Sequence, residues 1–257
     1  MRVYLDNSAT TALDAEVFEA MKPYFSEIYG NASSLHDFGR EALAAVDKAR
    51  QTIANYINAR RDEIFFTSGG SESDNWALTG TAHTYGKQGK HIVTTVIEHP
   101  AVMETCRKLQ KEGYEITYVK VGSDGRVSLD DIKKAVRDDT ILVSVMFANN
   151  EMGAIQPIEE IGAFCREEGI LFHTDAVQAA GSVKIDVKKM NIDMLSMSAH
   201  KFHGPKGIGL LYLRKGVRLE RLIVGGHQES GMRAGTTNTP GIIGMAKALE
   251  ISYRDME

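Results

Sequence analysis

The stretch ILVSVMFA, at residues 141–148, decides which class of fold this chain can adopt. It is the most hydrophobic segment of the sequence, and it is far too short to span a bilayer, so it indicates a buried strand. A strand that is apolar on both faces is expected at the centre of a sheet covered by helices on both sides.

Strand and helix patterns alternate outward from this segment. A helix is predicted to begin at Ser71, because Asp74, three residues later, completes a capping box. Repeated strand–helix units predict an α/β fold with a mostly parallel central sheet and helices on both faces. The remaining predicted strands cover 63–67, 91–97, 115–120, 170–173, 194–197 and 207–213, and the remaining helices cover 40–59, 101–111, 130–136, 158–168 and 242–257.

The composition disfavours several classes of protein. The 257 residues carry 30 basic and 34 acidic side chains, a net charge of −4, which disfavours nucleic acid and an anionic membrane surface as main partners. The start, MRVYLDNSATT, lacks the pattern of a signal peptide. Cys106 and Cys165 are too few for a disulfide framework or a multi-thiolate metal site. We therefore expect a cytoplasmic protein.

Small, polar or titratable residues follow five of the predicted strands. In open α/β sheets, ligands bind outside the carboxyl ends of the strands. These residues therefore predict one site at one edge of the sheet. The five segments are Ser68–Glu72, Glu98–Pro100, Asn149–Glu151, Thr174–Gln178 and Ser198–Lys201.

The first segment, SGGSE at 68–72, is a glycine turn that leads into a helix. It is either a plain turn or a cradle in which free backbone N–H groups bind a phosphate. No G-x-x-x-x-G-K-[ST] and no G-x-G-x-x-G occurs, which disfavours a nucleoside triphosphatase and a dinucleotide enzyme.

The other segments also allow two interpretations each. Asp175 is either a helix N-cap or a carboxylate directed at a ring nitrogen. His200-Lys201 is either a solvated basic pair or a site in which a desolvated lysine acts as nucleophile and base. His99 is either a loop residue or a flat ring that stacks on an aromatic ligand. His173, His200 and His203 fit no usual set of metal ligands, so we expect no metal.

One cofactor accounts for the whole combination. Pyridoxal phosphate needs a lysine for its Schiff base, an aspartate for its ring nitrogen and anion donors for its phosphate. The combination is far more specific than any single member.

The same segments resemble those of a known family, the cysteine desulfurases of the class V aminotransferase fold. The resemblance covers essentially the whole chain, in family order. It is carried by YLDNSATT (4–11), GNASSLHDFGR (30–40), FTSGGSESDN (66–75), EHPAV (98–102), NNEMGAIQPI (149–158), HTDAVQ (173–178), SAHKFHGPKGIG (198–209) and RAGTTN (233–238).

The resemblance implies a role for each matching residue. Lys201 would be the Schiff-base lysine that also moves the substrate's α-proton, Asp175 would hold the ring nitrogen protonated, and His99 would stack on the ring. Asn7 would lie on the substrate side, and Asn150 would contact both ring oxygen and substrate. The other cofactor residues would be Gln178 at the ring oxygen, Gly70, Ser71, Ser198 and His200 at the phosphate, and Thr236 contributed by the neighbouring subunit of a homodimer.

The implied reaction converts L-cysteine to L-alanine and passes the sulfur to a protein thiolate as a persulfide. The persulfide would serve an acceptor protein in iron–sulfur cluster assembly or tRNA thiolation. A selenocysteine lyase, another class V aminotransferase, or a catalytically incompetent fragment that binds cofactor and dimerises are the alternatives.

The resemblance also implies a domain organisation. Residues 1–14 would lie at the substrate side, 15–240 would form the large domain of pyridoxal phosphate fold type I, and 241–257 would begin the helix that leads to a largely absent C-terminal small domain. The family's acceptor cysteine and carboxylate-binding arginine belong to that small domain. Cys106 and Cys165 match family positions that are not catalytic.

Overall fold

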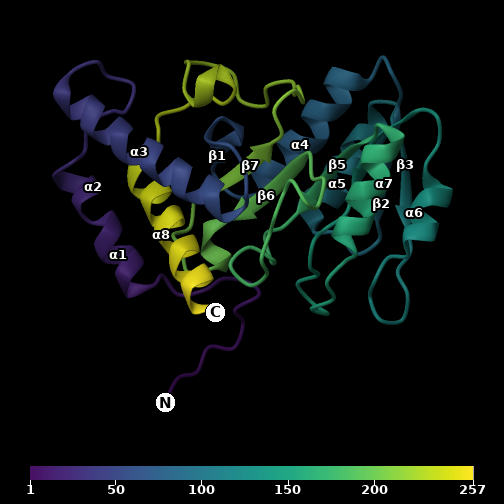
Figure 1. The fold of residues 1–257 in the computed structure, drawn as a ribbon, viewed down its shortest axis with the longest axis horizontal. Coiled ribbons are helices and arrows are strands. Elements are labelled where there is room, and N and C mark those ends of the chain that lie inside the picture. Colours follow the sequence, from purple (N-terminus) through teal and green to yellow (C-terminus); the bar gives the residue numbers. More distant parts are fainter. Residues whose placement is uncertain (257) are drawn as a thin grey trace.

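The computed structural model describes residues 1–256, which form a seven-stranded sheet between two layers of helices (Figure 1). The strand order is β1-β7-β6-β5-β4-β2-β3, and β7 runs opposite to the other six strands, so the predicted mostly parallel sheet is confirmed. The strands are β1 (Ile64–Thr67), β2 (His91–Thr95), β3 (Glu115–Val119), β4 (Thr140–Ser144), β5 (Leu171–Asp175), β6 (Met194–Ser198) and β7 (Gly209–Leu213).

Helices follow most of the strands, as the alternating patterns predicted. No helix within residues 1–256 has both the length and the apolar character that crossing a membrane requires. The α-helices are α1 (Ala15–Met21), α2 (Pro23–Ser26), α3 (Asp37–Tyr56), α4 (Gly70–Tyr85), α5 (Pro100–Lys111), α6 (Leu129–Ala135), α7 (Ile158–Glu168) and α8 (Thr239–Asp255), with short 3₁₀ turns η1 (Arg61–Glu63), η2 (Ala199–Lys201) and η3 (Glu229–Gly231).

Successive residues of each inner strand enter opposite hydrophobic cores, because side chains alternate across a sheet. In β4, Leu142 packs with α4 and α5, whereas Val143 packs with the helices of the other face. In β6, Met194 and Leu195 divide in the same way. Both faces are therefore buried, which explains why these strands are apolar throughout.

The apolar segment that suggested the fold, residues 141–148, begins in β4. This strand lies next to β5, the central strand of the sheet. The regular strand ends at Ser144, earlier than the predicted Ala148. Residues 145–148 remain buried, and the Phe147 N–H donates to the Asp175 carbonyl at 2.8 Å. This extension carries the chain over the end of β5, toward the predicted site.

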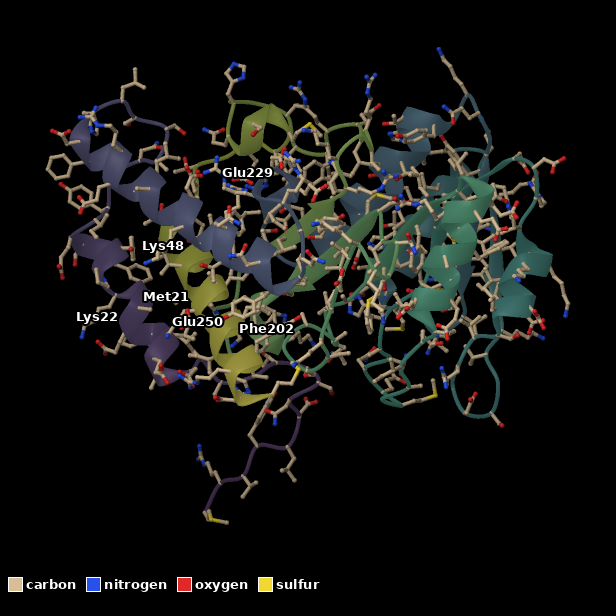
Figure 2. The ribbon with its side chains drawn as sticks, viewed as in Figure 1. Met21, Lys22, Lys48, Phe202, Glu229 and Glu250 are labelled. Carbon is tan, nitrogen blue, oxygen red and sulfur yellow. The ribbon has the colours of Figure 1, made fainter. Side chains whose placement is uncertain are left out.

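Helix α8 packs against α1 and α3 at one side of the sheet (Figure 1). Gly244 makes close packing possible, because a Cβ there would lie 2.5 Å from the sulfur of Met21 in α1 (Figure 2). The residues before α1 bond to the turn after β6, where the Thr11 N–H donates to the His200 carbonyl at 3.0 Å. This turn carries Lys201.

Candidate functional site

Residues from five strand ends surround one cavity of about 630 Å³, so the predicted clustering is confirmed. The N-terminal segment adds a wall that the strand-end argument did not predict. Of the predicted site residues, Gly70, Ser71, His99, Asn150, Asp175, Gln178, Ser198, His200 and Lys201 line the cavity, together with Asp6, Ser8, Ala9, Asp74, Met146, Glu151 and Val177.

The glycine turn of the cavity wall begins helix α4 without a side-chain cap. Gly69 is the N-cap residue, and its φ of 158° favours glycine. The predicted capping box from Ser71 to Asp74 is wrong: the helix begins one residue earlier, and it is Glu72 that accepts a hydrogen bond from the Ser68 N–H, at 2.8 Å. The first N–H groups of α4 are therefore free to bind an anion.

Close packing places this turn. A Cβ on Gly70 would lie 2.6 Å from Cγ2 of Val177, and one on Gly209 would lie 2.6 Å from Cα of Gly69. Lys206, which sequence reasoning missed, lines a neighbouring open hollow with Gly70, Ser71, Ser198 and His200. The glycine turn at the start of α4 thus has the Lys206 side chain nearby as well as its own N–H donors.

Asp175 ends β5 and is followed by a turn, so the predicted helix N-cap is wrong, and its carboxyl group caps that turn. Its Oδ1 accepts a hydrogen bond from the Val177 N–H at 2.9 Å, which fixes the following turn, and its carboxyl group still lines the cavity. Burial raises its pKa, while the Val177 N–H, His99 and Lys201 act in the opposite direction. Only 5% of the residue is exposed, so the carboxyl group is well shielded from water.

Lys201 lies on η2, directly after β6, and its ammonium donates to the carbonyl oxygens of Ala9, at 2.9 Å, and Ser8. Burial lowers its pKa, with Asp175 and Asp6 opposing the shift. Gln178 also donates to the Ser8 carbonyl, at 2.8 Å. The lysine is thus the partly desolvated amine that the sequence suggested.

The N-terminal segment is attached to the lysine turn by hydrogen bonds on both sides of Lys201. The Thr11 hydroxyl donates to the His200 carbonyl at 2.9 Å and accepts from the His203 N–H at 2.8 Å. The Thr10 hydroxyl pairs with the His200 ring at 3.0 Å. These contacts come from the small hydroxyl residues of NSATT, but no local pattern in that stretch predicted them.

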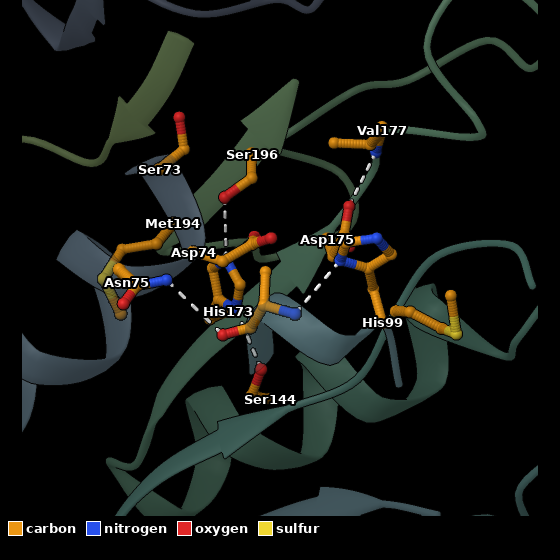
Figure 3. Close-up of polar contacts among 12 residues, drawn as sticks. Ser73, Asp74, Asn75, His99, Ser144, His173, Asp175, Val177, Met194 and Ser196 are labelled. Carbon is orange, nitrogen blue, oxygen red and sulfur yellow. Dashed lines mark hydrogen bonds and ion pairs between the residues drawn. The ribbon is translucent and has the colours of Figure 1, made fainter. Parts of the chain in front are cut away.

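His99 is the N-cap residue of α5, and its ring borders the cavity (Figure 3). Its Nδ1 accepts a hydrogen bond from the Ala101 N–H at 3.1 Å. An acceptor at Nδ1 leaves Nε2 to carry the proton of the neutral ring. The cap thereby fixes the ring at the mouth of the site.

Three buried titratable groups near the cavity were given no catalytic or binding role in the sequence analysis, and two of them, Asp74 and His173, are shown in Figure 3. Asp74 is 1% exposed, and burial followed by the charges of Asp175 and Glu98 raises its pKa well above the usual value. Burial also raises the pKa of Glu98 to about 8 and lowers that of His173 to about 3. The sequence placed Asp74 inside a helix, and only packing shows that it faces the strand ends.

The histidines considered for a metal are engaged elsewhere. The buried ring of His173 bonds to the hydroxyls of Ser144 and Ser196, at 2.8 and 3.1 Å, and His203 pairs with the Ala12 carbonyl. Within residues 1–256, the one group whose ligand atoms lie close enough to hold a cation is Asp74, His99 and Asp175, within 4.8 Å of one another.

Two predicted residues do not line the cavity. Asn7 is exposed, although its neighbours Asp6 and Ser8 do line it. Thr236 is exposed in the 220–238 loop and borders a different pocket, of about 220 Å³, with Ser68 and Arg233. Neither residue contributes to the cavity within this chain.

Comparison with known proteins identifies the family. Residues 3–257 match the model of the aminotransferase class-V family, and the chain therefore belongs to that family. It is 56% identical over 255 residues to the cysteine desulfurase IscS of Clostridium botulinum. The match covers 99% of this chain, which spans 64% of the length of that relative.

Solved structures agree with this assignment. A NifS-like protein superposes with a TM-score of 0.97 at 47% identity, covering 100% of this chain and 71% of the other. A structure described as SspA in complex with cysteine gives a TM-score of 0.95 at 43% identity, covering 97% and 72%. The family and the fold type I architecture expected from the sequence motifs are thus confirmed.

Proposed function

We propose that this chain binds pyridoxal 5′-phosphate and contributes the cofactor site of a cysteine desulfurase. The observation that carries the proposal is the placement of a partly desolvated lysine, Lys201, and a buried carboxylate, Asp175, on one cavity whose wall is an uncapped helix N-terminus. The named relatives support the choice of reaction.

The residues present fit this cofactor. Its phosphate requires N–H and hydroxyl donors, which the start of α4, Ser71 and Ser198 supply, with Lys206 close by. Its ring nitrogen requires a carboxylate, and Asp175 is the carboxylate with N–H and cationic support. The role of ring-oxygen donor falls to Asn150 and Gln178.

When bound, the cofactor withdraws electrons from the α-carbon of an amino acid, which acidifies the α-proton and makes a β-sulfur a leaving group. Lys201 then takes and returns the proton at its Nζ, because a lowered pKa leaves more of the amine unprotonated near neutral pH. The carbonyls of Ser8 and Ala9 hold the protonated form in place.

The sulfur must pass to a thiolate, forming a persulfide and leaving alanine. Cys106 and Cys165 are fully buried, and burial raises both thiol pKa values to about 12. We therefore assign the acceptor thiol to a residue outside these 257, serving a protein of iron–sulfur assembly or tRNA thiolation. Both thiols are unpaired, which agrees with the cytoplasm as the compartment.

We also propose a homodimer in which Thr236 serves the other subunit's site. Its support is that Thr236 is exposed and lies away from the cavity of its own chain. Mixing Lys201→Ala and Thr236→Ala chains tests this, since only a mixed dimer then contains one complete site. Recovered cofactor binding supports the exchange, and binding that equals the sum of the separate chains contradicts it.

The cofactor is tested directly. Wild-type protein mixed with pyridoxal phosphate should gain an absorbance band, and borohydride should fix an adduct that peptide mass spectrometry finds on Lys201. Lys201→Ala should lose both, whereas Lys215→Ala, an exposed lysine remote from the cavity, should keep both. A wild-type chain without band or adduct contradicts the proposal.

The reaction needs a separate measurement. Loaded protein given L-cysteine and dithiothreitol as an external thiol should form alanine and sulfide in equal amounts, and much less without the thiol. Preference for L-selenocysteine would instead indicate the lyase. No product with either substrate would show that residues 1–257 bind cofactor without turnover.

A further inference from the structure

Three buried carboxyl groups lie in or next to the cavity: Asp74 and Asp175 line it, and Glu98 is close enough for its charge to act on Asp74. Asp74, Glu98 and Asp175 are 1%, 7% and 5% exposed and come from α4, the β2–α5 connection and β5. One carboxyl oxygen each of Asp74 and Asp175, with a ring nitrogen of His99, lies within 4.8 Å of the others. Carboxylates this close and this dry cannot all be ionised near neutral pH.

The surroundings of the three groups differ. Asp175 accepts the Val177 N–H, and the charge of Lys201 favours its ionised form. Glu98 is bound on one oxygen by the Thr95 hydroxyl and the Met146 N–H, at 2.7 and 2.9 Å.

Asp74 lacks comparable support. Its Oδ1 has no hydrogen-bond partner among the described residues, and the ring nearest to it is His173, with Nε2 at 3.6 Å (Figure 3). Ser144 and Ser196 already hold both nitrogens of that ring, and burial keeps it neutral, so it supplies no positive charge. The Ser196 hydroxyl gives Asp74 only partial compensation.

We propose that Asp74 is a positioning residue that keeps its proton beside Asp175, so that Asp175 is the single anion of the pair and is held ready for the cationic ring nitrogen of the cofactor. The relevance to the cofactor rests on the proposed function; the protonation order does not. Because Asp74 stays neutral, the pair of Asp74 and Asp175 carries a single negative charge.

The order of ionisation predicts an asymmetry between two isosteric variants. If Asp175 ionises first, its titration occurs beside a neutral neighbour, and Asp74→Asn should move its midpoint by less than about half a pH unit. Asp74 ionises beside a charged neighbour, so Asp175→Asn should lower the midpoint of Asp74 by about one pH unit or more. If Asp74 ionised first instead, the asymmetry between the two variants would be reversed.

The experiment is a carboxyl ¹³C NMR titration of the full 257-residue chain without cofactor, with aspartate labelled and the two signals assigned from the variants. At pH 7, Asp74 should show the protonated shift and Asp175 the ionised one. Glu98, His173, His99, Lys201 and Asp6 face the pair, so their titrations are followed in the same samples.

Each result is decisive. An ionised Asp74 at pH 7, or a fall of Asp175's midpoint by a full unit in Asp74→Asn, overturns the proposal. If an asparagine variant does not fold, the matching Asp→Glu variant, which removes the same labelled signal, assigns it, and the two wild-type midpoints then decide the order. A chain that shows the predicted order but never binds pyridoxal phosphate leaves this inference standing and refutes the proposed function alone.

Discussion

Arg233 and Glu72 form a double ion pair, with Nε–Oε1 at 2.8 Å and Nη2–Oε2 at 2.9 Å, and it joins the 220–238 loop to the first turn of α4. Burial alone would raise the pKa of Glu72, but the hydrogen bonds from Arg233 and Ser68 outweigh it and lower the pKa. Glu72 is therefore ionised next to the anion cradle, and Arg233 offsets its charge.

Replacing Arg233→Gln should weaken binding of pyridoxal phosphate about fivefold to tenfold, because an uncompensated carboxylate then opposes the phosphate; about 1 kcal/mol corresponds to fivefold. Binding is measured by absorbance titration. The double variant Glu72→Gln/Arg233→Gln should regain most of the affinity. Pyridoxal, which lacks the phosphate, serves as the control ligand, and an equal loss for it would contradict the electrostatic explanation.

Glu98→Gln should flatten the dependence of stability on pH. The pKa of Glu98 rises from 4.5 to about 8 on folding, so its contribution is present below about pH 4.5 and is lost as the pH rises through about 8. At 1.36 kcal/mol per pKa unit, the loss is at most roughly 5 kcal/mol. Urea unfolding of wild type and variant at pH 5.5, 7 and 8.5 measures it.

The control for this series is Glu115→Gln, because Glu115 is exposed on β3. The difference in unfolding free energy between Glu98→Gln and wild type should change in favour of the variant as the pH rises. Parallel curves for the two proteins would contradict the assignment of this pH dependence to Glu98.

Glu229→Gln should destabilise the 220–238 loop. Its carboxylate accepts two hydrogen bonds from Arg50 at 2.7 Å and one from the Phe66 N–H at 2.9 Å, while its backbone has a φ of 47°. Removing one partner of a buried ion pair costs about 3 kcal/mol, because the other charge stays buried. Urea unfolding measures the loss, and proteolysis should shift to this loop.

A double variant separates the ion pair of Arg50 and Glu229 from the role of Glu229 as acceptor for the Phe66 N–H. Replacing Arg50→Met with Glu229→Gln together removes both charges, so it should cost less than either change alone. Losses that simply add would show that the two residues act independently.

Thr11→Val should loosen the lysine turn. The variant keeps the shape of the side chain but loses the bonds to the His200 carbonyl and the His203 N–H, about 2 kcal/mol together. Lys201 should then exchange faster between positions and form its cofactor adduct more slowly. Stopped-flow absorbance gives the rate of adduct formation. An unchanged rate would show that the hydrogen bonds of Thr11 do not help to position Lys201.

Much of the fold could be predicted from the sequence because strands such as Leu142–Val143 are apolar on both faces and alternate with helices. The strand-end rule also gathered Gly70, His99, Asp175 and Lys201 correctly. Such rules assign a residue to an element, but they do not determine which residues of a helix face a strand end. Asp74 was therefore interpreted as a cap, although it lies 1% exposed at the cavity floor.

Contacts between distant segments were the other gap. Nothing local in NSATT shows that Thr11 would bond to His200, and nothing in the 220–238 loop shows that Arg233 would reach Glu72. These contacts depend on the tertiary arrangement, which brings the N-terminal segment and the 220–238 loop to the strand ends. Sequence periodicity describes elements, and such returns leave no periodic signal.

The antiparallel strand β7 has a consequence for biosynthesis. β1 lies at the sheet edge with β7 as its neighbour, so Thr67 finds its partner only in Gly209. On the ribosome, the glycine turn after β1 therefore emerges long before the strand that holds it, and closing so long a loop is slow. A ligand of that turn can bind only once most of this chain has been synthesised, so it stabilises the finished sheet and does not guide its assembly.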